Sequence, residues 1–131
     1  MDTNTKKKVL VVEDERTLRN ILQDKLKSEG FSVLAAKDGL EGLKIALKDH
    51  PDLILLDIIM PKMDGIDLLK KLRTDRWGKT VPVLLLTNDI NPEHMSETLK
   101  VNANDYLVKS ELGLGDVIKK VKKTLGRSKS S

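Results

Sequence analysis

The sequence of 131 residues contains no cysteine and only one phenylalanine, one tryptophan and one tyrosine. The absence of cysteine excludes a disulfide scaffold, a thiolate zinc site and a cysteine nucleophile. Three aromatic side chains are too few for a site built on base stacking, so the core must be aliphatic. Every apolar run is shorter than the roughly 18 residues that a membrane-spanning helix needs, so no membrane span is expected. The length suits one domain.

The charge is unevenly distributed along the chain. Of the net charge of +4, residues 1–8 contribute +2 and residues 115–131 contribute +5, which leaves −3 for residues 9–114. The basic residues therefore belong to the two ends, and direct nucleic-acid binding is not expected, because that function calls for a basic face with base-contacting groups. The basic N-terminus lacks the apolar region and cleavage site of a secretion signal, so we expect a cytoplasmic protein.

Short apolar runs alternate five times with segments that have helical spacing. Because the runs show no polar alternation, they indicate strands buried on both faces, as in parallel sheets. The expected strands are Val9–Val12, Phe31–Ala35, Leu53–Leu56, Val81–Leu86 and Tyr106–Val108. The helical segments, each with one apolar stripe, span Leu18–Leu26, Leu40–Leu47, Ile66–Leu72, Met95–Leu99 and Leu114–Leu125.

This alternation predicts an α/β domain with a parallel sheet. The chain is too short for an eight-stranded barrel, so we expect an open, doubly wound sheet with helices on both faces. Of two possible five-stranded orders, the flavodoxin-like order 2-1-3-4-5 fits the length best. We assign residues 8–125 to this domain, residues 1–7 to a flexible tail and residues 126–131 to a disordered one. In this fold the ligand site lies at the carboxyl ends of strands one and three.

Turn residues mark the expected helix ends. Gly30 should end the first helix, and His50 the second, because the residue before a proline disfavours the helical conformation. Asp64 is expected to cap the third helix with its side chain. Trp77 is expected to pack the loop after that helix, and His50 to be solvated rather than a ligand.

Polar residues follow four of the expected strands. They are Glu13 and Asp14, Asp57, Thr87 and Lys109. Three neighbouring carboxylates repel one another unless a cation joins them, and a set of oxygen ligands suits Mg²⁺ or Mn²⁺. A carboxylate can also act as a nucleophile and form an acyl phosphate. The constellation therefore predicts phosphoryl transfer to Asp57 assisted by Mg²⁺.

These residues lie in motifs that resemble the receiver domain of the two-component response regulator family, over residues 8 to about 125. The matching segments are VLVVED at 9–14, DIIMPKMDG at 57–65, the hydroxyl of Thr87 and DYLVK at 105–109. The resemblance implies that Asp57 accepts phosphate from a sensor histidine kinase or a phosphotransfer protein. It also implies Mg²⁺ held by Asp14, Asp57 and the carbonyl of Ile59, with Glu13 acting mainly through water or hydrogen bonds.

The resemblance implies a switch as well. Lys109 would pair with the phosphoryl group and Thr87 would shift to hydrogen-bond it, while Tyr106 turns inward behind Thr87. The surface of the fourth helix, fifth strand and fifth helix would then signal to a downstream protein or a fused output domain. Such a domain catalyses only its own phosphorylation and dephosphorylation. Whether the chain acts alone or as part of a longer protein is left open.

Two other functions compete with a phosphorylated receiver. An aspartate phosphatase of another α/β family commonly has a second acid two residues after the nucleophile, where this chain has Ile59, and needs an insertion that is absent here. A degenerate receiver used only for protein contacts would not need the full set of acidic, hydroxyl and lysine residues. The departures from the family pattern, Asn88, Asp89 and Ser110, bear on rate and loop geometry rather than on identity.

Overall fold

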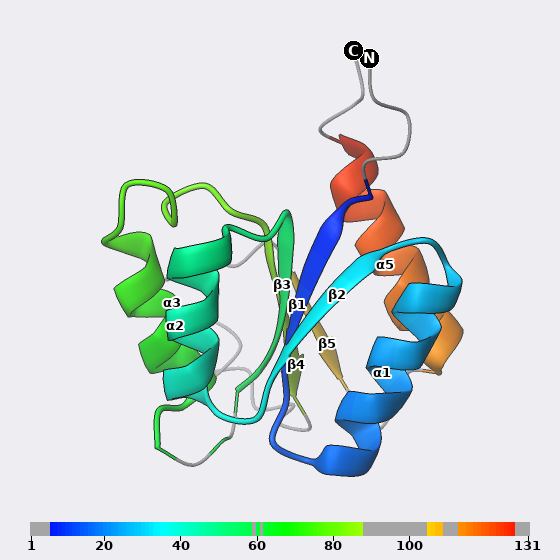
Figure 1. The fold of residues 1–131 in the computed structure, drawn as a ribbon, viewed down its shortest axis with the longest axis horizontal. Helices are drawn as coiled ribbons and strands as arrows, with labels where there is room; N and C mark the ends of the chain where they lie inside the picture. The colour runs from blue at the N-terminus through cyan, green and yellow to red at the C-terminus, as the bar shows by residue number, and fades with distance from the viewer. Residues whose placement is uncertain (1–5, 59, 61, 88–104, 109–112, 128–131) are drawn as a thin grey trace.

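The computed structural model of the chain describes residues 6–58, 60, 62–87, 105–108 and 113–127. Five parallel strands form one sheet in the order β2-β1-β3-β4-β5, with helices on both faces (Figure 1). The strands are β1 (Lys8–Val12), β2 (Ser32–Ala36), β3 (Leu53–Asp57), β4 (Val83–Thr87) and β5 (Asp105–Val108). The helices are α1 (Arg16–Ser28), α2 (Gly39–Asp49), α3 (Gly65–Arg73) and α5 (Leu114–Arg127). The predicted flavodoxin-like fold is confirmed.

Two strands begin later than the apolar runs suggested. Phe31 precedes β2 because its N–H donates to the carbonyl of Leu26 at 3.1 Å, which ties it to the end of α1. Before β4, Pro82 has no N–H to donate to a ladder, although its carbonyl accepts from the N–H of Ile54 at 2.9 Å. The expected helix around Met95–Leu99 lies outside the described residues.

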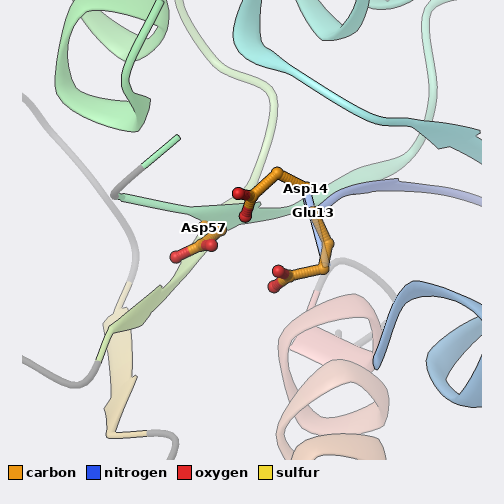
Figure 2. Close-up of side chains that lie close together, drawn as sticks. All are labelled: Glu13, Asp14 and Asp57. Atoms are coloured by element: carbon orange, nitrogen blue, oxygen red, sulfur yellow. The ribbon is translucent and has the colours of Figure 1, made fainter. Parts of the chain in front are cut away.

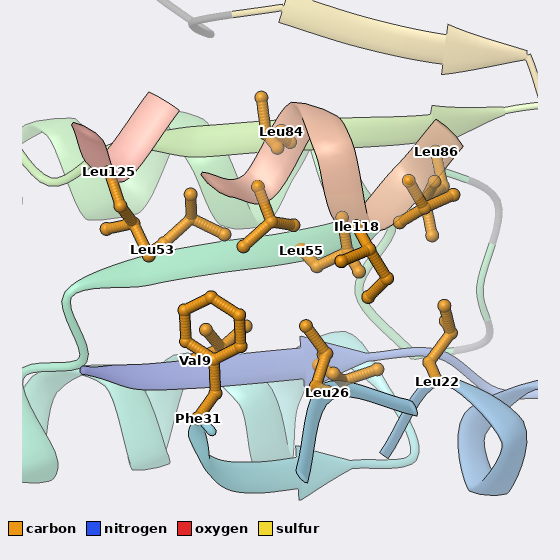
Figure 3. Packing of buried hydrophobic residues seen from close by; sticks show 13 residues of the cluster. Val9, Leu22, Leu26, Phe31, Leu53, Leu55, Leu84, Leu86, Ile118 and Leu125 are labelled. Atoms are coloured by element: carbon orange, nitrogen blue, oxygen red, sulfur yellow. The ribbon is translucent and has the colours of Figure 1, made fainter. Parts of the chain in front are cut away.

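Two apolar layers cover the sheet. Alternate residues of each strand point to opposite layers, so Val9 and Val11 of β1 pack towards α1 and α5 while Leu10 and Val12 pack towards α2 and α3. Because both faces are covered, the strands are mostly apolar apart from one polar residue at an end of each, as expected of a parallel sheet. The first layer, seen in Figure 3, consists of Val9, Val11, Leu22, Leu26, Phe31, Leu53, Leu55, Leu84, Leu86, Val117, Ile118, Val121 and Leu125.

The helix ends follow local rules. His50 has a left-handed backbone with φ of 48° just after α2, and Asp64 caps α3 by accepting from the N–H of Asp67 at 2.9 Å. Trp77 packs on the exposed His50, with ring centroids 4.4 Å apart and planes 12° from parallel. This stack joins the α3–β4 loop to the end of α2, a contact that the sequence did not indicate.

Within the ranges that the structure describes, the helices are too short or too polar to cross a bilayer. The longest of them, α5, has 14 residues and carries four lysines. Such a helix covers a sheet with one face and meets solvent with the other.

The core predicts how two leucine truncations should differ. Leu26 of α1 is fully buried, whereas Leu47 of α2 is 39% exposed. Leu26→Ala should lower the free energy of unfolding by about 2–5 kcal/mol, because it leaves a cavity as well as removing apolar burial. Leu47→Ala should change it by about 0.5 kcal/mol or less. Urea unfolding of both variants measures the difference, and equal losses would contradict this assignment of the core.

Candidate functional site

The acidic site follows from the register of two neighbouring strands. β1 and β3 are paired so that Val12 lies beside Leu56, and the next residues, Glu13 and Asp57, leave the sheet at the same edge. Asp14 follows Glu13 directly. The three carboxyl groups offer oxygen atoms that all lie within 4.8 Å of one another (Figure 2). The structure therefore brings together the three carboxylates that the sequence singled out.

The three carboxyl groups differ in their exposure to solvent. Glu13 is fully buried and Asp57 is 4% exposed, whereas Asp14 is exposed. The cluster is thus closed on its inner side and open towards solvent at Asp14. A small charged ligand entering from solvent would meet Asp14 first.

Main-chain contacts fix the turn that carries Glu13 and Asp14. The N–H of Glu13 donates to the carbonyl of Ala36 at 3.1 Å, which holds it against the end of β2. Oε2 of Glu13 accepts from the N–H of Glu15 at 3.0 Å. The guanidinium of Arg19, one turn into α1, donates to the carbonyls of Glu13 at 2.9 Å and of Asp14 at 3.4 Å. The positively charged side chain of Arg19 therefore lies beside the turn and binds its main-chain oxygens.

A close approach of two main chains shapes the loop after Asp57. The N–H of Ile58 donates to the carbonyl of Leu86 at 3.1 Å, and the N–H of Gly65 donates to the carbonyl of Ile58 at 2.7 Å. A Cβ atom on Gly65 would lie 2.5 Å from the carbonyl oxygen of Asp57 and 2.8 Å from Cα of Ile58. Only glycine lets the first turn of α3 return this closely to Asp57.

The turn between β2 and α2 contacts the same loop. The buried carboxylate of Asp38 caps α2 by accepting from the N–H of Glu41 at 2.8 Å, and its other oxygen lies 3.7 Å from Nζ of Lys62. The hydrogen bond from Glu41, with the Lys62 charge adding to it, holds the pKa of Asp38 below its usual range. Sequence reasoning missed this contact, because the two segments meet only in the folded chain.

Two further predicted site residues, Thr87 and Tyr106, lie on β4 and β5. Thr87 is the last residue of β4 and pairs with Val108, while Tyr106 of β5 pairs with Leu85. Lys109 and Ile59 lie outside the described residues. The backbone of Thr87 reaches the sheet edge where Asp57 ends β3, since Asp57 pairs with Leu86.

The donor set fits a hard divalent cation. Among the residues that the structure describes, it consists of carboxylate oxygens without nitrogen or sulfur ligands, and such sets favour Mg²⁺ or Mn²⁺ over zinc or copper. A cation would also relieve the repulsion that three carboxylates exert on one another at this separation. The residues present therefore fit Mg²⁺ on the chemistry of their donors.

The sequence matches the family model of the response regulator receiver domain over residues 9–122. It is 41% identical over 103 residues to the alkaline phosphatase synthesis transcriptional regulatory protein PhoP of Bacillus subtilis, which covers 79% of this chain and 42% of that protein. It is 34% identical over 122 residues to response regulator MprA of Mycobacterium leprae, and the match covers 93% of this chain and 52% of that protein. The chain spans about half the length of the curated relatives it matches.

Solved structures show the same fold. The chemotaxis response regulator CheY4 of Vibrio cholerae is 34% identical with a TM-score of 0.85, over 91% of this chain and 98% of that one. The receiver domain of the sensor histidine kinase PA1611 from Pseudomonas aeruginosa is 25% identical with a TM-score of 0.84, over 93% and 99%. That structure has a magnesium ion coordinated in the active-site cleft.

The lowered pKa of Asp38 predicts a pH-dependent contribution to stability. Asp38→Ala should destabilise the protein near neutral pH, because it removes the cap of α2 and the partner of Lys62. The contribution is fully present above the pKa of an unfolded aspartate, about 3.9, and is lost as pH falls through the lower folded value. The urea midpoints of wild type and variant should therefore converge on acidification. A gap of constant size from neutral to strongly acidic pH would contradict the assignment.

Proposed function

The chain belongs to the response regulator receiver domain family, and from this premise we propose that it is phosphorylated on Asp57 by a sensor histidine kinase or a phosphotransfer protein. The observation that carries the proposal is the position of Asp57. Its carboxylate ends β3 within 4.8 Å of the carboxylates of Glu13 and Asp14, at the edge of the sheet where solvent reaches the cluster. A carboxylate in that setting can act as a nucleophile.

In the proposed reaction, an oxygen of Asp57 attacks the phosphorus of a phosphohistidine. The phosphorus–nitrogen bond breaks, its electron pair returns to the imidazole, and an acyl phosphate forms on Asp57. Asp14, Asp57 and the carbonyl of Ile59 would hold Mg²⁺, or Mn²⁺ in its place, with Glu13 acting mainly through water or hydrogen bonds. When bound, Mg²⁺ supplies positive charge opposite the carboxylates and the phosphoryl oxygens.

We propose Lys109 and Thr87 as partners of the phosphoryl oxygens and Tyr106 as the residue that follows the movement of Thr87. The pairing of β4 with β5 supports these roles, because Thr87 and Val108 are register partners and Lys109 comes next in the chain. β5 therefore ends at the edge of the sheet where the acidic cluster lies. The changed surface would involve β5, α5 and the segment between β4 and β5.

The proposed output is a protein contact. The chain would catalyse only its own phosphorylation and dephosphorylation, and would signal to a downstream protein or a fused output domain. Several relatives are named transcriptional regulators, and this chain spans about half of their length. We propose that any nucleic-acid contact lies outside the receiver, which agrees with the net charge of −3 over residues 9–114.

Phosphorylation by acetyl phosphate tests the proposal directly. With Mg²⁺ present, the intact mass of the wild type should rise by one phosphoryl group, and Asp57→Asn should show no rise because the amide is a poor nucleophile. Asp52→Asn is the matched control, since Asp52 precedes the same strand at its other end and is exposed. The control should be modified like the wild type. An adduct that persists in Asp57→Asn would place the acceptor elsewhere.

Mg²⁺ should stabilise the folded protein through the acidic cluster. At ten times Kd, binding to the native state alone adds about 1.4 kcal/mol, which corresponds to a rise of about 3–6 °C in melting temperature. Asp14→Ala should abolish this rise, whereas Asp24→Ala, which removes an exposed carboxylate of α1 outside the cluster, should retain it. Differential scanning fluorimetry measures the Mg²⁺-induced rise in melting temperature of each variant. Equal rises in the two variants would refute the metal assignment.

A further inference from the structure

We propose that Asp38 is a positioning residue that sets the Mg²⁺ affinity of the acidic cluster by holding the β3–α3 loop through Lys62. This inference rests on the proposed function, in which the loop supplies the carbonyl of Ile59 as a metal ligand. It assigns a task to the β2–α2 turn, which contributes no ligand itself.

The loop carries an unfavourable backbone conformation away from its base. The hydrogen bonds from the N–H of Ile58 to Leu86 and from the N–H of Gly65 to Ile58 tie down its two ends. Between those ends, Lys62 has φ of 69°, in the left-handed region that side chains other than glycine adopt rarely. Such a conformation persists where the surrounding structure holds it, and it is often found at functional sites. The contacts of Lys62 are therefore expected to stabilise the conformation of the loop.

Two consecutive residues of the loop contact two consecutive residues of the β2–α2 turn. Nζ of Lys62 lies 3.7 Å from Oδ2 of Asp38. The carbonyl of Met63 lies so close to Gly39 that a Cβ atom there would overlap it. The turn thus holds the loop by one charged contact and one steric contact.

The turn is itself held rigidly, and it is joined to the other half of the cluster. Asp38 caps α2 through Oδ1, while Oε1 of Glu41 accepts from the N–H of Lys37 at 2.8 Å. One residue earlier, the carbonyl of Ala36 accepts from the N–H of Glu13. The turn between Ala36 and Gly39 therefore links the strand end that carries Glu13 to the loop that follows Asp57.

The expected size of the effect follows from exposure. The side chain of Lys62 is 63% exposed and that of Asp38 is 7% exposed, so solvent screens the ion pair from one side. Pairs of this kind change equilibria by a small factor, and we expect loss of the Lys62 charge to raise the Kd for Mg²⁺ about two- to five-fold. The ligands themselves stay in place, so binding should weaken without being lost.

The experiment measures the Kd for Mg²⁺ by NMR titration of backbone amides in the full chain. Lys62→Met removes the charge, and Asp38→Asn removes it from the other partner while keeping an oxygen that can cap α2. Both should raise Kd about two- to five-fold, and Lys62→Arg, which keeps the charge, should leave Kd at the wild-type value. In Lys62→Met the rise runs against direct electrostatics, because removing a positive charge would by itself strengthen the binding of a cation. Glu29→Gln is the control, because it breaks an ion pair with Lys122 between α1 and α5, on the other face of the sheet.

The outcomes separate the two proposals. A wild-type or lower Kd in Lys62→Met would overturn the positioning role alone, because the loss of the Asp38 carboxylate weakens cation binding by its charge in any case. An equal rise in Kd in Glu29→Gln and Lys62→Met would also overturn the positioning role, because the weaker Mg²⁺ binding would then reflect a loss of overall stability. Absence of saturable Mg²⁺ binding in the wild type would instead overturn the proposed metal site and, with it, this inference. Melting temperatures in Mg²⁺-free buffer should be alike for Lys62→Met and Glu29→Gln.

Discussion

The pairing of β1 with β3 is the constraint on which the site depends. These two strands are parallel neighbours at the centre of the sheet, and their register places Glu13 and Asp57 side by side beyond Val12 and Leu56. A slip of one residue would move every side chain of a strand to the opposite face. Because both faces pack against helices, such a slip would bury a carboxyl group among leucines or isolate it from the cluster.

The site combines unfavourable electrostatics with a large apolar core. Two of its three carboxyl groups are buried, next to strands that are almost wholly aliphatic. Charges of one sign at this separation raise the free energy of the folded state, and a bound cation lowers it again. Stability and ligand binding are therefore linked in this domain. The contacts that Arg19 and the end of β2 make with the main chain of Glu13 hold the carboxylates in place despite their repulsion.

The elements with strong local signals were predicted closely. Asp64 caps α3 as expected, and the apolar runs identified all five strands, although β2 and β4 start later than the runs do. Those two starts depend on Phe31 bonding back to α1 and on the missing donor of Pro82, which hydrophobicity does not register. The stack of His50 on Trp77 joins residues 27 positions apart, and neither residue's neighbours in the chain indicate it.

The sequence by itself determined the fold class, the strand order through the fit of its length to a known fold, and the residues at the strand ends. Apolar periodicity and chain order carry that information, because burial on both faces demands aliphatic strands and parallel strands end at one edge. Only the tertiary structure decided which carboxyl groups are buried and how the loop after Asp57 is held. Two contacts hold that loop, one between Asp38 and Lys62 and one between Gly39 and Met63. Both depend on how α2 packs against the sheet, because packing rather than any local sequence pattern sets the distance between two turns.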